Sequence, residues 1–138
     1  MFPINLLAVL VAAIANFVIG FLCHGPVLGK VWMRLADIHP TGNERFADMV
    51  PQLLWNFLVN LVFAFGLAVV YLFASTSPLL GPGLATGLKV AFVVWLCFLV
   101  TSSSIGVIWM RQSSKLWLFE SFCSLLSLLA MGAIIASW

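Results

Sequence analysis

Charged residues are what this sequence most lacks. Only 7% of its 138 residues are Asp, Glu, Lys or Arg, whereas soluble domains carry about 25%. Hydrophobic residues make up 64% of the chain, and the mean hydropathy is +1.19. A chain with so few charges has no polar coat, which excludes a soluble globular domain. Its six cations are scattered and form no basic patch, so the net charge of +2 does not predict nucleic-acid binding.

The sequence also lacks the motifs of known enzyme classes. It contains no His-Glu-x-x-His, no pair of intramembrane aspartates and no Gly-x-Ser-x-Gly. The histidines, His24 and His39, and the cysteines, Cys23, Cys97 and Cys123, show no metal-ligand spacing. We therefore expect no enzymatic activity, no cofactor and no metal site. The cysteines are expected to act as buried apolar side chains.

The sequence contains four long apolar runs, whereas the helices and strands of a soluble protein alternate apolar with polar residues. About 20 residues cross the hydrocarbon core of a bilayer, and the runs cover residues 4–23, 52–74, 84–105 and 116–137. The first run lacks the basic flank of a signal peptide and is long enough to span, so we expect it to be a membrane helix. The sequence predicts an all-α fold, with residues 1–138 forming one integral membrane domain of four transmembrane helices.

The cations are unevenly distributed between the connections. Five lie in the first and third connections, and Lys89 alone belongs to the opposite side. By the positive-inside rule, connections 24–51 and 106–115 are expected in the cytoplasm and both termini outside, in a cell membrane such as the bacterial inner membrane. The five cations are Lys30, Arg34, Arg45, Arg111 and Lys115.

Residues 27–38 of the first connection have the pattern of an amphipathic helix. Apolar residues recur at helical spacing, while Lys30 and Arg34 fall on another face. This pattern predicts a helix lying in the membrane interface, with Trp32 at headgroup level and the two cations toward anionic lipid. Two interpretations remain open, namely a structural foot and a gate or partner-docking element.

Small and polar residues form a stripe along each of the first two spans. Such stripes let membrane helices approach closely, so we expect both to face the bundle. In the second span three amides are followed by two alanines at every fourth position. The stripes are Asn5, Ala8, Ala12, Asn16 and Gly20 in the first span, and Gln52, Asn56, Asn60, Ala64 and Ala68 in the second.

The third and fourth spans carry polar stripes as well, and two interpretations compete for all four. In one, the seams are interhelical hydrogen bonds worth about 0.6 kcal/mol each in a dry bundle. In the other, they line an aqueous path or a polar binding pocket. The stripes are Thr86, Lys89, Val93, Cys97, Thr101 and Ser104 in the third span, and Glu120, Ser124 and Ser127 in the fourth.

Two ionisable residues lie inside the predicted spans. An ionised group at mid-bilayer costs at least about 2.5 kcal/mol, so such residues need a reason. Lys89 is close enough to the outer end of its helix to snorkel. Glu120 is favoured near its helix N-terminus by the dipole and is within reach of Lys30, Arg34 or Arg111. A functional interpretation makes Glu120 a proton or cation site.

Several short motifs resemble those of a known family. They are the opening run Asn5-Leu-Leu-Ala-Val-Leu-Val-Ala-Ala, then Gly25-Pro26 and Gly29-Lys30-Val31-Trp32-Met33-Arg34-Leu35, and near the end Lys115-Leu116-Trp117-Leu118 and Met131-Gly132-Ala133-Ile134. Over nearly its whole length the chain resembles the "domain of unknown function 1761" family of small bacterial membrane proteins. The resemblance implies a four-helix membrane protein, and it supplies no activity or catalytic residues.

Two functional hypotheses follow. The leading one is a homo-oligomeric membrane protein that passes or binds a small solute or ion. Gln52, Asn56 and Asn60 would be its polar lining and Glu120 its titratable group. The secondary candidates are Asn16, Lys89, Thr101, Ser104 and Ser124. The alternative is a structural or accessory membrane subunit with a dry bundle, in which the same residues are packing seams.

Overall fold

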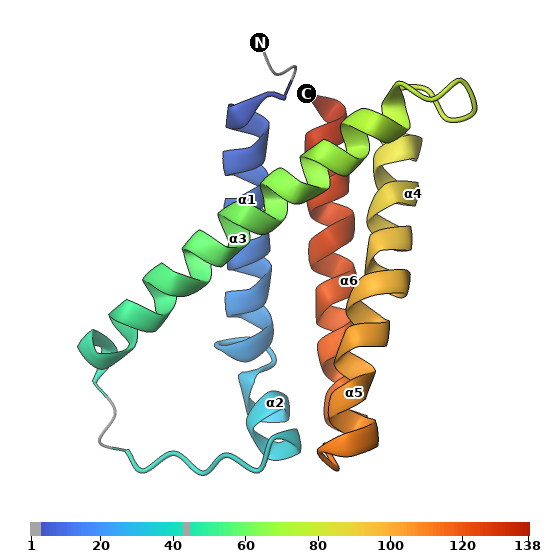
Figure 1. Cartoon of the computed structure of the whole chain (residues 1–138). Helices are drawn as coiled ribbons and strands as arrows, with labels where there is room; N and C mark the ends of the chain where they lie inside the picture. Colours follow the sequence, from blue (N-terminus) through green and yellow to red (C-terminus); the bar gives the residue numbers. More distant parts are fainter. Residues whose placement is uncertain (1–3, 43–44) are drawn as a thin grey trace.

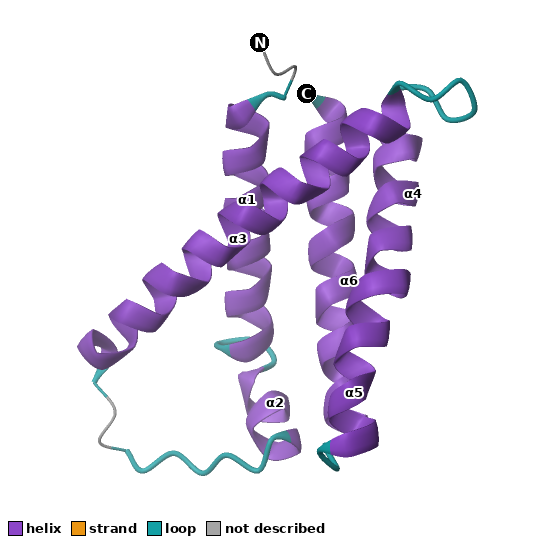
Figure 2. Cartoon of the chain, in the orientation of Figure 1, coloured by secondary structure: helices purple, strands orange, loops and turns teal. Residues whose placement is uncertain are grey.

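The computed structural model describes residues 4–42 and 45–138, and within these ranges the chain contains helices and connections but no strand (Figure 2). The helices are α1 (Leu6–His24), α2 (Gly29–Leu35), α3 (Phe46–Ser75), α4 (Leu84–Val94), the π-helical segment η1 (Trp95–Val100), α5 (Thr101–Trp109) and α6 (Ser114–Ser137). The third span is continuous, because α4, η1 and α5 follow one another without a break.

Four helices are long and apolar enough to cross a membrane. They cover Leu6–His24, Ala47–Ser75, Leu84–Trp109 and Ser114–Ser137. This confirms the predicted all-α fold and identifies a multi-pass membrane protein. The second span begins earlier than predicted, so Pro51 lies inside α3 instead of before it. The short helix α2 occupies the centre of the segment predicted to be amphipathic.

Different helix ends and connections lie at the two ends of the bundle. The start of α1, the end of α6 and the α3–α4 connection lie at one end, which we call the termini end (Figure 1). Helix α2 and the α5–α6 connection lie at the other, which we call the α2 end. Helix α6 packs against both α1 and α4, and α3 crosses α1 diagonally before it reaches α4. Toward the α2 end, α3 diverges from the other helices.

The tightly packed core lies in the termini half of the bundle. Met131 is 0% exposed and Leu128 is 1% exposed, and small residues surround them. Small side chains let membrane helices approach closely, which replaces the hydrophobic effect as a source of packing energy. The predicted alanine stripes are confirmed, since Ala8, Ala12, Ala64 and Ala68 are buried. The core cluster consists of Val9, Ala12, Ala13, Ala64, Leu67, Ala68, Val90, Met131 and Ile135.

Helices α4 and α6 make their closest approach at two glycines. A Cβ added at Gly87 would lie less than 3.0 Å from the Gly132 carbonyl oxygen and the Ala136 Cβ. A Cβ added at Gly132 would come equally close to the Gly87 carbonyl oxygen and the Ala91 Cβ. Each glycine is four residues from an alanine on its own helix, which is the small-xxx-small pattern of membrane interfaces.

The predicted inward face of the third span is wrong beyond its first turn. Thr86 is buried, but Lys89, Val93, Cys97 and Thr101 are exposed. The packing face is instead built from small and apolar residues such as Gly87, Val90 and Ala91, which pack against α6 more closely than polar side chains allow.

The hydroxyl groups of α5 explain how a polar run can face outward. Thr101 Oγ1 donates to the Cys97 carbonyl at 2.5 Å, and Ser102 Oγ donates to the Phe98 carbonyl at 2.5 Å. Ser104, which is half-buried, donates to the Thr101 carbonyl at 2.6 Å. Hydroxyls satisfied by their own helix need no partner from another helix.

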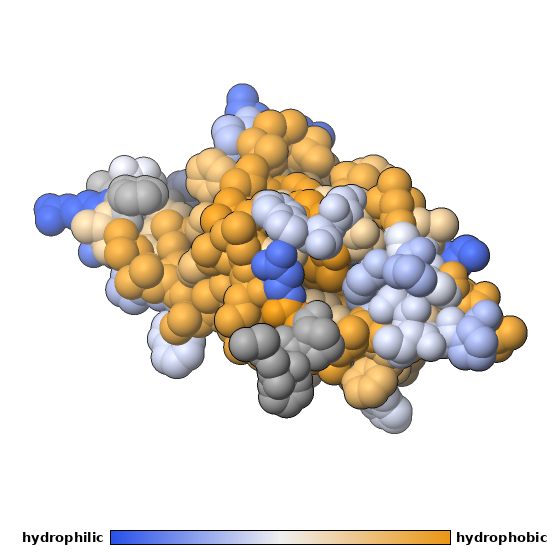
Figure 3. Space-filling model, turned by 90° about the horizontal axis from the view of Figure 1, so that it is seen from above, coloured by the Kyte–Doolittle hydropathy of each residue, from blue (hydrophilic) through white to orange (hydrophobic). Residues whose placement is uncertain are grey.

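The flank of the bundle is apolar, as expected for a surface in contact with lipid. In the view from the termini end, hydrophobic residues make up much of the visible face, and polar residues gather in patches on it (Figure 3). Large exposed side chains include Trp55, Val62 and Phe73 on α3, each at least 70% exposed. On a soluble protein such a surface would drive aggregation.

Candidate functional site

A cavity of about 630 Å³ lies at the α2 end, where α3 diverges from the bundle. Ligand sites in proteins usually measure about 300 to 1,000 Å³. Its lining includes apolar residues of α1 and α3, namely Phe17, Phe21, Met49 and Leu53. Polar residues of α1, α3 and α6 line the same cavity: Asn16, Asn56, Asn60, Glu120, Ser124 and Ser127. A single chain therefore encloses a space of the size of a small ligand.

Glu120 is the charged group of this cavity. It lies in the second turn of α6, and its side chain is 43% exposed. Its Oε1 accepts a hydrogen bond from Trp32 Nε1 at 3.1 Å and lies 3.6 Å from His24 Nε2. Helices α1, α2 and α6 therefore meet at one carboxylate oxygen.

His24 closes α1 and is held from two sides. Its Nδ1 lies 2.9 Å from the Gly20 carbonyl oxygen, which can only accept, so Nδ1 donates in this contact. The imidazole stands edge-to-face with the Trp32 ring at a centroid distance of 5.2 Å, and with the Phe119 ring at 6.3 Å. These contacts fix the imidazole so that Nε2 points toward Glu120.

Two asparagines join α1 and α3 at the inner part of the cavity. Asn16 Nδ2 donates to Asn60 Oδ1 at 3.0 Å, and both residues are half-buried. Asn56, one turn closer to the α2 end, is exposed and lines the cavity. The amide pair marks the boundary between the packed termini half and the open α2 half.

The π-helical segment supplies a further contact behind the cavity wall. Trp95 Nε1, at its start, donates to the Ser121 carbonyl at 2.8 Å and to Ser124 Oγ at 3.1 Å. Ser121 Oγ is buried without a hydrogen-bond partner among the described residues. Isolated π-helical turns occur often at functional sites. Ser124 is thereby held in place on the cavity wall.

Two thiols are buried next to the charged group. Cys23 and Cys123 are each 4% exposed, and Cys123 lines the cavity, whereas Cys97 is exposed on the third span. Within residues 4–42 and 45–138, no group of three or more His, Cys, Asp or Glu side chains is placed to hold a metal ion.

The structure brings together some of the predicted site residues and separates others. Asn56, Asn60 and Glu120 line one cavity, and so do the secondary candidates Asn16 and Ser124. The remaining predicted residues lie elsewhere. Gln52 is exposed on α3, and its side-chain amide, oriented to donate, reaches the Asp48 carbonyl at 2.8 Å. Lys89 and Thr101 are exposed on the third span. Ser104 donates to a carbonyl of its own helix.

Sequence reasoning missed His24 and the inward role of Trp32. The pattern of residues 27–38 placed Trp32 at headgroup level beside Lys30 and Arg34. In the structure the two cations are exposed, while the indole N–H turns into the bundle. Their positions along the spans could have indicated this contact. His24 ends the first span, and Glu120 lies two turns into the fourth span, which runs antiparallel to the first, so both residues lie near the same membrane surface.

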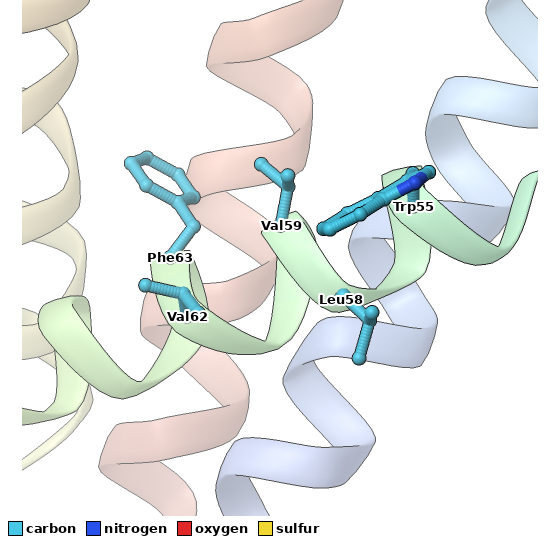
Figure 4. Close-up of a pocket in the computed structure, with 5 residues that line it drawn as sticks. All are labelled: Trp55, Leu58, Val59, Val62 and Phe63. Carbon is cyan, nitrogen blue, oxygen red and sulfur yellow. The ribbon is translucent and has the colours of Figure 1, made fainter. Parts of the chain in front are cut away.

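A second hollow of about 320 Å³ lies on the outer face of α3. It is lined by Trp55, Leu58, Val59, Val62 and Phe63, all from one helix (Figure 4). Its lining carries no charged group, so it offers nothing to recognise a polar ligand. It is a part of the apolar flank.

One of three comparisons with known proteins gives a match. The family model described as "Protein of unknown function (DUF1761)" matches residues 7–136, which is nearly the whole chain. No curated protein and no solved structure matches.

Proposed function

The chain belongs to the DUF1761 family of proteins of unknown function, and from that premise we propose that it binds a small solute in the cavity at the α2 end. The carrying observation is the Glu120 carboxylate, half-exposed in a cavity of about 630 Å³ inside a membrane bundle. An ionisable group within a membrane span is costly and marks a functional site unless a structural role accounts for it.

Packing does not account for Glu120. The core that holds the bundle together lies in the termini half and is apolar. A dry seam would bury its polar groups against one another, as Asn16 and Asn60 do. Glu120 contacts Trp32 and His24 through one oxygen, but its side chain is still 43% exposed, and it lines the cavity together with the exposed Asn56. This difference favours the binding hypothesis over a dry accessory bundle.

We propose that solute reaches the cavity from the cytoplasm. Five of the six cations belong to the α2 end, either in α2, in the connections or in the first turn of α6, and the positive-inside rule assigns this end to the cytoplasmic side. The packed core closes the other half. Passage across the membrane would therefore need a rearrangement of α3, the helix that diverges from the bundle.

Thiol labelling tests the proposal. In a background lacking Cys23, Cys97 and Cys123, a cysteine at Asn56 should react rapidly with a membrane-impermeant thiol reagent. A cysteine at Ala68, on the same helix but buried in the core, is the matched control and should stay unlabelled. Labelling should occur from the cytoplasmic side of inverted vesicles. A folded protein whose Asn56 cysteine resists the reagent from both sides would contradict the proposal and favour a dry accessory subunit.

A further inference from the structure

We infer that the ligand of this cavity is an organic cation with an apolar body, and that its binding at Glu120 displaces one proton held by the His24–Glu120 pair. The inference rests on the proposed function and specifies its substrate class. Three observations carry it: the hydrogen-bond roles around His24, the free oxygen of Glu120, and the aromatic lining beside both.

The hydrogen-bond roles favour a proton shared by the pair. His24 Nδ1 donates to the Gly20 carbonyl, so the neutral imidazole with this tautomer has a bare lone pair on Nε2. That lone pair would face Glu120 Oε1 at 3.6 Å, and an ionised carboxylate there would be a second acceptor. A proton on Nε2 or on Oε1 removes the repulsion. The pair with one proton is neutral overall.

The second oxygen of the carboxylate is available to a ligand. Both neighbours, Trp32 Nε1 and His24 Nε2, approach Oε1. No described residue donates a hydrogen bond to Oε2, and Glu120 lines the cavity. An acceptor-only carboxylate oxygen selects for positive charge and rejects anions.

The walls around this oxygen suit an apolar body. Phe17 and Phe21 line the cavity together with the rings of His24 and Trp32. Aromatic faces attract cations and contact hydrocarbon equally well. A hydrated metal ion would find no such match, because hard cations prefer several oxygen ligands. The lining therefore favours an organic cation over an inorganic one.

Charge balance predicts that one ligand cation is exchanged for one proton. The loaded pair is neutral and the ligand carries one positive charge. When the ligand binds at Oε2 and the proton leaves to bulk water, the site holds a neutral imidazole, a carboxylate and the ligand cation. One positive charge has replaced another, so the low-dielectric site gains no net charge.

Among the residues that the structure describes, no Lys or Arg side chain lines the cavity or bonds to the pair. From α1 the titratable groups beside the pair are His24 itself and Cys23, and α6 adds Cys123. From α2 only the indole of Trp32 reaches the carboxylate, since Lys30 and Arg34 are exposed and bond to no group of the pair in the described chain. Helix α3 contributes amides, which do not titrate.

Binding of tetraphenylphosphonium to the purified full chain tests the inference. This probe is permanently charged, so any proton released comes from the protein. In weakly buffered detergent solution, saturation should release up to one proton per bound cation. The affinity should rise about tenfold per pH unit while the pair is protonated and level off above that range. Triphenylphosphine oxide, of similar shape but neutral, should bind at least about tenfold more weakly.

Variants isolate the carboxylate. Glu120→Gln should reduce affinity for tetraphenylphosphonium by about tenfold to a hundredfold and abolish proton release. Asp48→Asn removes an exposed carboxylate outside the cavity and should leave both unchanged. Glu120→Asp keeps the charge and should still prefer the cation to the neutral probe. This variant tests the role of the carboxylate if Glu120→Gln does not fold.

Several results would overturn the inference. They are equal affinity for the charged and neutral probes, unchanged binding by folded Glu120→Gln, and binding without proton release at any pH. The labelling experiment separates this failure from that of the proposed function. If the cysteine at position 56 is labelled but the cation does not bind, the proposed substrate class is wrong, whereas the proposal of a water-accessible binding cavity is retained. If that cysteine does not label, both proposals fall.

Discussion

The contact between Gly132 and Gly87 makes the stability of the termini half sensitive to one methyl group. A Cβ at Gly132 would lie less than 3.0 Å from the Gly87 carbonyl oxygen and the Ala91 Cβ, and neither atom belongs to a flexible side chain. The backbones of α4 and α6 must therefore separate. Overpacking of this kind costs about 1 to 3 kcal/mol. The gain in helix propensity from Gly to Ala offsets about 0.5 to 1 kcal/mol of that.

We expect Gly132→Ala to lower the free energy of unfolding by about 0.5 to 2 kcal/mol, and Tm by about 2 to 8 °C. The matched control is Gly66→Ala on α3, where an added Cβ meets nothing within 4 Å. Its Tm should equal or exceed that of the parent. Thermal unfolding in detergent, followed by near-UV circular dichroism, measures both variants. If Gly132→Ala melts together with Gly66→Ala, the two helices do not approach as closely as described.

Three further predictions concern single hydrogen bonds. Trp32→Phe keeps an aromatic ring but removes the N–H to the cavity carboxylate, so protease should cut residues 36–42 several-fold faster, whereas Trp109→Phe at an exposed site should not change the rate. Changing Asn16 and Asn60 singly and together to Ala should give a coupling of about 0.6 kcal/mol in unfolding experiments, and additive effects would rule out their bond. Tyr71→Phe removes the hydroxyl that accepts from the Gly83 N–H at 3.0 Å; hydrogen exchange in the α3–α4 connection should accelerate, and unchanged protection would contradict the contact.

The four spans could be predicted because their signal is physical and local. A run of apolar residues as long as the bilayer is thick has few alternatives to a membrane helix. The ends were less certain. Helix α3 starts at Phe46, earlier than the predicted residue 52, and continues through Pro51. The third span ends at Trp109, past Ile105, since the hydroxyls of α5 satisfy their own helix and do not break it.

The site could be predicted only in part, because polarity alone does not say where a side chain points. The stripe on the second span located Asn56 and Asn60, since amides at every fourth residue share a face. The same reasoning failed for Thr101, because its hydroxyl is satisfied by the backbone of its own helix and needs no partner on another helix. The meeting of His24 with Glu120 depends on how two helices far apart in the sequence pack together. No periodicity in either helix contains that information.

The hydrogen bond from Trp32 to Glu120 couples the position of α2 to the cavity. Helix α2 exposes Lys30 and Arg34 but also donates to the carboxylate inside the cavity, so its seat on the bundle and the state of that carboxylate are thermodynamically linked. Linkage is reciprocal. Whatever changes the charge on the carboxylate changes how firmly α2 is held, and whatever displaces α2 changes the properties of the carboxylate by the same factor. A contact made on the exposed face of α2 would thus reach the cavity through one indole.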